Sequence, residues 1–117
     1  MTPIKDSRGK TLWKDCEPAD SAWKKFKGIM FRKKVEKPLL FSFDDVGRKR
    51  NSIHSFFCFA RFDAIFIDGN KRIADVRENI GPFVPLIIPA SSVKYLIECA
   101  AGEARKKGLK KGVKLVF

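Results

Sequence analysis

The 117-residue chain is long enough for one domain with a single hydrophobic core, and 44% of its residues are hydrophobic. Lysine and arginine total 25 against 13 acidic residues, and the resulting net charge of +12 favours encounters with phosphates and other anions. No segment is apolar over the ~18 residues of a membrane span, and the N-terminus carries no apolar signal region. We therefore expect residues 1–117 to form one cytoplasmic domain without a membrane partner.

Cysteine usage and short motifs argue against several classes of site. Cys16, Cys58 and Cys99 are odd in number and form no CxxC pair, which disfavours a disulfide framework and a zinc ribbon. Neither a Walker-type glycine loop nor GxGxxG occurs, so we expect no cofactor. Glutamine is absent and 32% of the residues are charged, a composition typical of proteins from hot environments.

The N-terminal half is predicted to contain short strands and one helix. Residues 9–16 are expected to form a strand. Residues 19–34 change to a helical period, because Trp23, Phe26 and Met30 fall on one face. Further strands are expected at 37–45, which Pro38 opens, and at 53–59, which is apolar on both faces.

The C-terminal half begins with the clearest local signal. Segments 63–67 and 72–76 flank Asp68-Gly69, which predicts a β-hairpin because glycine tolerates positive φ. Residues 78–92 contain three prolines that cannot donate to a β-ladder, so this stretch should be a loop or ragged edge. A strand at 93–99, a short helix at 100–108 stopped by Gly108, and a strand at 112–117 complete the chain.

These elements together predict an α+β fold that is mainly β. Six or seven strands need partners that bury their apolar faces. A curled antiparallel or mixed sheet that approaches a small barrel, with one or two short helices, meets that need.

One histidine and one aspartate lie within the most apolar run of the chain. His54 sits beside apolar residues, and a functional role would need a carboxylate partner to set its tautomer and raise its pKa. Alternation places Asp63 on the face of Ile65 and Ile67, so an inward-facing Asp63 must be hydrogen-bonded. Two roles stay open for Asp63: an acceptor for backbone N–H groups, or a polar group at the mouth of a pocket, with Arg32 as counter-ion.

Enzymatic alternatives have weaker support. His54, Asp63 and Glu98 could together form a metal-dependent or hydrolytic site, but no HxH or HExxH spacing supports it. Glu98 and Asp75 are each expected to be surface ion-pair partners. Cys99 lies in an apolar strand, where burial raises a thiol pKa and disfavours nucleophilic catalysis. We expect no catalytic residue and no metal, and a binding or accessory module rather than an enzyme.

The lysines and arginines cluster in two patches, at 24–37 and 105–114. In the first patch lysines alternate with Trp23 and Phe26, a mixture suited to phosphate contact and base stacking, although both aromatics also fit the helix's apolar stripe. The alternative function is therefore sequence-independent binding of nucleic acid as an anionic partner. Its candidate residues are Lys24, Lys25, Lys27, Lys33, Lys34, Arg105, Lys106, Lys107, Lys110 and Lys111.

Four stretches occur in an order that resembles a known family: "GIMFRKK", "LLFSF", "IHSFFCFARFDAIFIDGNKRI" and "YLIECAAGEARKKGLKKG". They are similar to the motifs of the uncharacterised family known as domain of unknown function 192, and the resemblance covers residues 21–117. It implies a compact β-rich domain without an established activity.

The resemblance also bears on the candidate site. Three positions depart from the family pattern: Cys58 replaces the usual Met, Arg61 lies in a stretch that replaces "FPID", and Val113 stands where an Asp commonly follows Gly112. The leading hypothesis is a polar pocket near His54 and Asp63, drawn from matching motif positions. Its candidate residues are Met30, Arg32, His54, Asp63 and Glu98.

Overall fold

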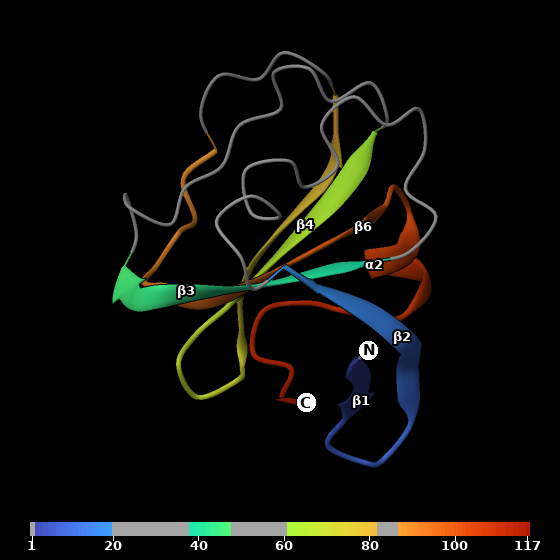
Figure 1. The fold of residues 1–117 in the computed structure, drawn as a ribbon. Helices are drawn as coiled ribbons and strands as arrows, with labels where there is room; N and C mark the ends of the chain where they lie inside the picture. Colours follow the sequence, from blue (N-terminus) through green and yellow to red (C-terminus); the bar gives the residue numbers. More distant parts are fainter. Residues whose placement is uncertain (1, 20–37, 48–60, 82–86) are drawn as a thin grey trace.

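The computed structural model describes residues 2–19, 38–47, 61–81 and 87–117 (Figure 1). Within these ranges strands dominate and the helix is a single turn. The elements are β1 (Thr2–Asp6), β2 (Thr11–Ala19), β3 (Leu39–Gly47), β4 (Phe62–Ile67), β5 (Ile73–Ile80), β6 (Val93–Ala100), α2 (Glu103–Lys106) and β7 (Leu115–Val116). No helix among the described residues is long and apolar enough to span a bilayer.

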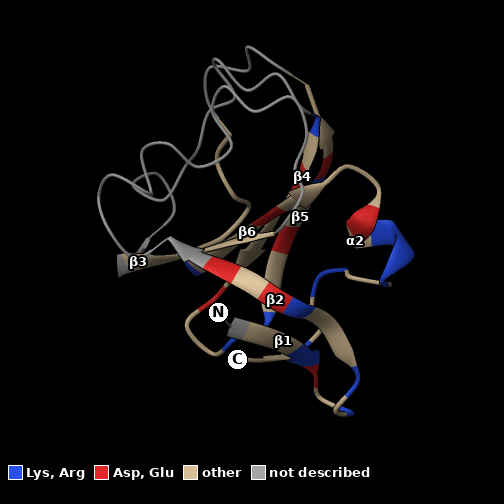
Figure 2. Ribbon diagram, turned by 45° about the vertical axis from the view of Figure 1, so that its right-hand side comes forward, with Lys and Arg blue, Asp and Glu red and all other residues tan. Residues whose placement is uncertain are grey.

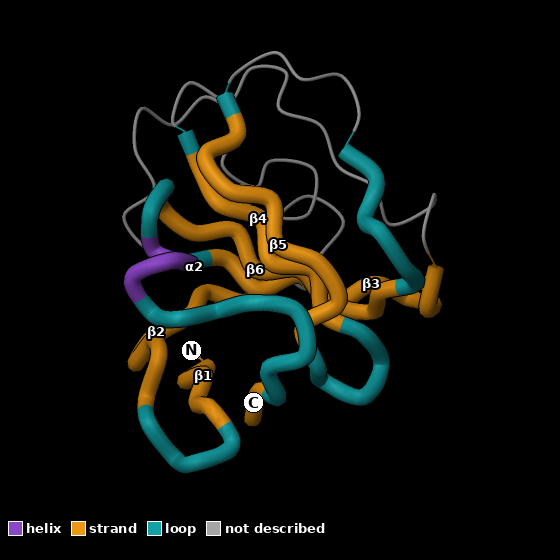
Figure 3. Tube along the Cα trace, turned by 180° about the vertical axis from the view of Figure 1, so that it is seen from behind, coloured by secondary structure: helices purple, strands orange, loops and turns teal. Residues whose placement is uncertain are grey.

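The strands form one mixed sheet in the order β5-β4-β6-β3-β2-β1-β7. The pair β2–β3 is parallel, and the other pairs are antiparallel. The sheet curls strongly, so that β1 and the C-terminus approach the β4–β5 turn (Figures 1 and 3). The predicted fold class, a mainly β domain whose sheet approaches a small barrel, is confirmed.

The two edges of this sheet meet. Arg72, just before β5, forms an antiparallel bridge with Lys114, just before β7. Around the bridge, Ile73 N donates to Val113 O at 2.8 Å and Leu115 N donates to Lys71 O at 2.8 Å. These bonds satisfy backbone groups that an open edge would leave exposed. We call this contact between residues 71–73 and 112–115 the closure.

Both faces of the central strands are apolar because each face has its own core. All seven strands contribute to one cluster, which includes Ile4, Ile65, Ile97 and Leu115 and fills the inside of the curl. Residues that alternate with these along the strands, such as Phe66, lie in a second cluster on the outer face. This arrangement explains why all six residues of β4 are buried, as expected for a strand covered on both sides.

The predicted hairpin is confirmed, but the residue with positive φ in its turn is not the one that was predicted. Asp68 Oδ1 accepts hydrogen bonds from Asn70 N at 2.9 Å and Arg72 N at 3.0 Å. The residue with positive φ is Lys71, at 63°, rather than Gly69. The aspartate side chain therefore stabilises the turn, because one of its oxygens accepts hydrogen bonds from two backbone N–H groups of the turn.

Other boundaries differ where sequence signals are weak or mixed. β1 was not expected, and β5 continues to Ile80, into the stretch 78–92 predicted as a loop. α2 forms as predicted after Gly102, whose φ of 94° suits glycine, and it ends before Gly108. Of the expected helix at 19–34 only Ala19 is described, as the last residue of β2, and the expected strand at 53–59 lies outside the described residues.

Candidate functional site

Asp63 is fully buried at the start of β4, on the inner face with Ile65 and Ile67. Its Oδ1 accepts a hydrogen bond from Asn79 N at 2.8 Å. Its Oδ2 accepts hydrogen bonds from Gly102 N and Ala104 N, both at 3.0 Å. Three backbone donors therefore compensate the cost of burying this carboxylate.

A β-bulge directs the first of these donors. Phe62 pairs with Ile80 and Ala64 pairs with Arg77, so β5 carries one extra residue opposite Asp63. Asn79 lies in this bulge with φ 53°, a left-handed conformation that asparagine tolerates better than most residues. The bulge removes the Asn79 N–H from the regular ladder and points it at the carboxylate.

Of the two roles left open for Asp63, the structure shows the acceptor of backbone N–H groups. A groove of about 690 Å³ does pass the site, and Glu78, Arg105 and Lys106 also line it. Both Asp63 oxygens are nevertheless used within the protein. The other residues expected here, Met30, Arg32 and His54, lie outside the described residues.

Glu98 does not share a face with Asp63. In the β4–β6 register Asp63 pairs with Cys99, while Glu98 pairs with Ala64 on the opposite face. Glu98 is only 7% exposed, so the expected position on the surface is wrong; β3 and β4 flank β6 on both sides and bury this residue. The described residues contain no group of three or more His, Cys, Asp or Glu that could hold a metal ion.

The structure also shows the surroundings of Asp75 and of the two described cysteines. Asp75 pairs with Arg77 at 2.8 Å, as predicted for a surface ion pair, and also accepts a hydrogen bond from Ala90 N at 3.0 Å. Burial raises the pKa of the Cys16 thiol to about 12 and raises that of Cys99 as well. Both thiols are therefore protonated and poorly nucleophilic at neutral pH.

The second basic patch lies on α2 and the loop that follows it (Figure 2). Figure 3 shows this loop running from α2 toward the C-terminus. The closure brings Arg72 to this region and the pairing of β1 with β7 brings Arg8, and both arginines line a cavity of about 380 Å³ together with Lys107 and Lys114. Sequence reasoning missed Arg8 and Arg72 because only the closed sheet makes them neighbours of residues 105–114. We call residues 105–114 with Arg8 and Arg72 the basic surface.

Several cations of the basic surface are positioned by uncharged groups. Lys107 Nζ donates to Leu12 O at 2.7 Å and lies 5.2 Å from the centre of the Trp13 ring. Arg72 donates to Gly112 O at 3.4 Å, and Lys114 Nζ donates to Asn70 O. Backbone carbonyls orient these side chains without neutralising their charge.

Acidic partners on the basic surface are few. Lys107 lies 3.5 Å from Glu103, and Arg105 lies 3.4 Å from Glu78 in a pair whose arginine side chain is 84% exposed. An exposed pair such as Arg105–Glu78 contributes little to binding or stability. No described residue forms a hydrogen bond or ion pair with the side chains of Arg8, Lys106, Lys110 or Lys111. The surface therefore keeps most of its positive charge.

Comparison with known proteins places the chain in a family. The family "Uncharacterized ACR", domain of unknown function 192 (DUF192), matches residues 4–117. A UPF0127 protein of Pyrococcus horikoshii is 32% identical over 97% of this chain and 91% of its own length. A UPF0127 protein of Thermococcus sibiricus is 30% identical over 85% of this chain, and the match spans 63% of that relative. These archaea are thermophiles, in agreement with the composition.

Solved structures support the same fold. A crystal structure of a protein of unknown function from Novosphingobium aromaticivorans aligns with a TM-score of 0.84 at 20% identity, covering 99% of this chain and 84% of that one. At this identity the likeness is evidence for the fold alone. The family match spans nearly the whole chain, and it extends the resemblance seen in the motifs to the N-terminal strands. The chain therefore belongs to the uncharacterised DUF192 family.

Proposed function

We propose that this protein is a binding module for an anionic partner, and that nucleic acid binds to the basic surface without sequence preference. The observation that carries the proposal is the imbalance of charge there. Arg8, Lys106, Lys110 and Lys111 have no acidic partner among the described residues, and Arg72 and Lys114 donate to carbonyls rather than carboxylates.

Such a surface binds nucleic acid by displacing condensed counterions from phosphates. Each lysine or arginine that neutralises a phosphate adds to affinity and also to its dependence on salt. The proposal therefore requires affinity that falls steeply as salt is added. The first basic patch, 24–37, lies outside the described residues and is not needed for the argument.

The polar pocket predicted around His54 and Asp63 receives less support as the functional site. Three backbone N–H groups already occupy the Asp63 carboxylate, so that carboxylate is not available to orient a ligand. Glu98 faces the other side of the sheet. For these reasons the basic surface, rather than that pocket, is the proposed binding site.

Fluorescence anisotropy with labelled single-stranded and duplex oligonucleotides tests the proposal, at low salt and again at about 0.2 M salt. We expect binding to duplex DNA with a log-log salt slope of about −0.9 for each phosphate neutralised. Absence of binding at low salt, or affinity independent of salt, would refute nucleic-acid binding.

Matched variants locate the interface. The double variant Lys110→Ala/Lys111→Ala removes two exposed cations of the basic surface, and Lys5→Ala/Lys14→Ala removes two exposed cations on β1 and β2. The first pair should reduce the salt slope by about one for each lysine, whereas the second pair should leave it unchanged. Equal effects of the two pairs would mean that net charge alone attracts the nucleic acid.

A further inference from the structure

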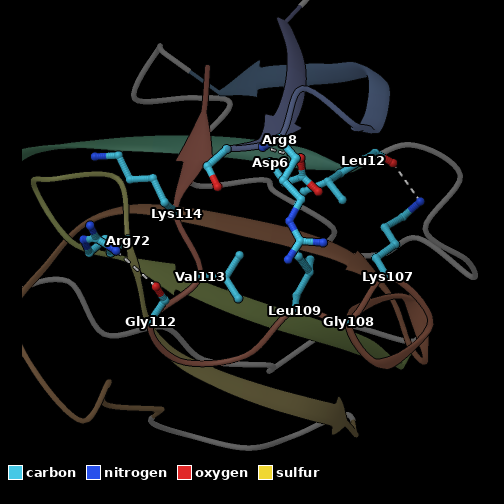
Figure 4. A pocket seen from close by; sticks show the side chains of 11 residues that line it. Asp6, Arg8, Leu12, Arg72, Lys107, Gly108, Leu109, Gly112, Val113 and Lys114 are labelled. Carbon is cyan, nitrogen blue, oxygen red and sulfur yellow. Dashed lines mark hydrogen bonds between the residues drawn. The ribbon is translucent and has the colours of Figure 1, made fainter.

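We infer that the cavity at the closure is a binding site for a phosphomonoester group. The cavity has a volume of about 380 Å³, within the range of small-molecule sites. It is distinct from the open surface of Lys106, Lys110 and Lys111, because its lining comes from the β1–β2 turn, Leu12 of β2, Arg72 and the loop after α2 (Figure 4). The inference concerns one phosphate group and does not depend on the proposed nucleic-acid binding.

Arg8 is the central group of this cavity. Its side chain extends into the cavity toward Leu109 (Figure 4), and no described residue forms a hydrogen bond or ion pair with its guanidinium. A guanidinium carries five N–H donors in a planar fork that matches the oxygens of a phosphate. The cavity therefore holds a full set of donors that the described part of the protein does not use.

The surrounding cations are held in place before any ligand binds. Carbonyl oxygens of Leu12, Gly112 and Asn70 accept hydrogen bonds from Lys107, Arg72 and Lys114. A lysine ammonium has three donors and an arginine has five, so each side chain keeps further donors for a ligand. Such preorganisation reduces the entropy lost when a ligand binds.

The acidic residue in the lining does not cancel this charge. Asp6 Oδ1 accepts hydrogen bonds from Arg8 N and Lys10 N, both at 2.9 Å, and so organises the β1–β2 turn. Asp6 makes no ion pair with the lining cations. The described lining thus contains four cationic side chains and one carboxylate, and of the four cations only Lys107 pairs with an acidic residue, Glu103, which lies outside the lining.

The shape and charge of the cavity favour a phosphomonoester over the phosphodiesters of a nucleic-acid chain. A phosphomonoester carries nearly two negative charges at neutral pH and three terminal oxygens, which suit the several donors of the Arg8 guanidinium, the group that extends into the cavity (Figure 4). Leu12, Leu109 and Val113 supply apolar wall for the organic part of the ligand. The group can belong to a free metabolite or to the phosphorylated end of a strand.

Isothermal titration calorimetry compares adenosine 5′-monophosphate with adenosine, which differ only in the phosphate. A second comparison uses a 5′-phosphorylated oligonucleotide and its 5′-hydroxyl counterpart. Preference for the phosphate in the first comparison identifies a free phosphorylated ligand, and preference only in the second identifies a strand end. Equal binding within both pairs, or no binding in either, overturns the inference.

Two substitutions in one turn provide the matched control. Arg8→Ala removes the central guanidinium, whereas Lys10→Ala removes an exposed cation that does not line the cavity. We expect Arg8→Ala to weaken binding of the phosphorylated probe by at least about tenfold and Lys10→Ala by less than about twofold. Equal losses would overturn the site. Lys110→Ala/Lys111→Ala should leave binding of adenosine 5′-monophosphate unchanged, because neither lysine lines the cavity, and this separates the inference from the proposed function.

Discussion

Asp63 and Ala104 are 41 positions apart in the chain, yet Asp63 Oδ2 accepts a hydrogen bond of 3.0 Å from Ala104 N. The same carboxylate binds the backbone of Asn79 and Gly102. One side chain at the start of β4 therefore connects the bulge of β5 to the entry of α2. The orientation of α2, and with it the basic surface, depends on this buried acceptor.

Replacement of Asp63 should strongly destabilise the protein. Asp63→Ala leaves three backbone N–H groups without their acceptor in a fully buried position, and we expect a loss of about 3 kcal/mol or more in the free energy of unfolding. Urea denaturation followed by circular dichroism measures it. Asp68→Ala is the control, because its two turn N–H groups are accessible to water, and it should cost only about 1 kcal/mol. Equal losses would contradict the role assigned to Asp63.

The bulge at Asn79 predicts an unusual order of stabilities. Asn79→Gly keeps the N–H that binds Asp63 and suits φ 53°, so its unfolding free energy should stay within about 1 kcal/mol of the original. Asn79→Val forces a β-branched residue into a left-handed conformation and should cost about 1–3 kcal/mol. Thermal unfolding of the two variants tests this. A valine variant as stable as the glycine variant would show that the bulge can rearrange.

The closure should contribute to global stability through Leu115. This side chain is fully buried, and Leu115→Ala should lower the free energy of unfolding by about 2–5 kcal/mol. The neighbouring Val116 is 51% exposed, so Val116→Ala in the same strand should change stability by less than about 0.5 kcal/mol. Denaturant midpoints distinguish the two. Similar small effects would mean that β7 frays from the sheet.

The buried thiols predict a loss of stability in alkali. The pKa of Cys16 is raised from 9.0 to about 12 in the folded protein, chiefly by burial, so the folded state retains a proton that the unfolded state releases. The contribution of this thiol to the free energy of unfolding is therefore fully present below pH 9.0 and is lost as the pH rises toward 12. Each thiol should contribute a slope of up to about 1.4 kcal/mol per pH unit.

The double variant Cys16→Ala/Cys99→Ala isolates this effect. Burial and the charge of Asp63 raise the pKa of Cys99 too, so both thiols should contribute. Comparing the unfolding free energies of the variant and the original protein at several pH values cancels the contributions of all groups that the two proteins share. A difference that stays constant above pH 9.0 would show that the thiols do not titrate differently on unfolding.

Local signals predicted much of the described fold. The run FDAIFID and the following turn specify the β4–β5 hairpin, and alternation correctly assigns Asp63 to the face of Ile65. The secondary-structure propensities of the residues also predict β3, β6 and the single turn of α2. These features are recognisable because each depends on residues close together in the chain.

The remaining features depend on contacts between distant segments. β1 is short and charged, and it becomes a strand only because β2 and β7 flank it. The burial of Glu98 follows from the strands on both sides of β6, which alternation within β6 does not reveal. Arg72 joins the basic surface through the closure, and Arg8 joins it through the pairing of β1 with β7. Sequence periodicity describes one strand at a time and contains no information on which strands become neighbours.

The closure also constrains how the protein is made. Residues 112–115 bond to residues 71–73, and β7 pairs with β1, whose strand begins at Thr2. During synthesis, β1 and the start of β5 must wait for the C-terminal segment to leave the ribosome before this part of the ladder forms. Contacts this distant in sequence are slow to form. Until they do, the nascent chain exposes two unpaired strand edges, which are the surfaces most prone to association with other chains.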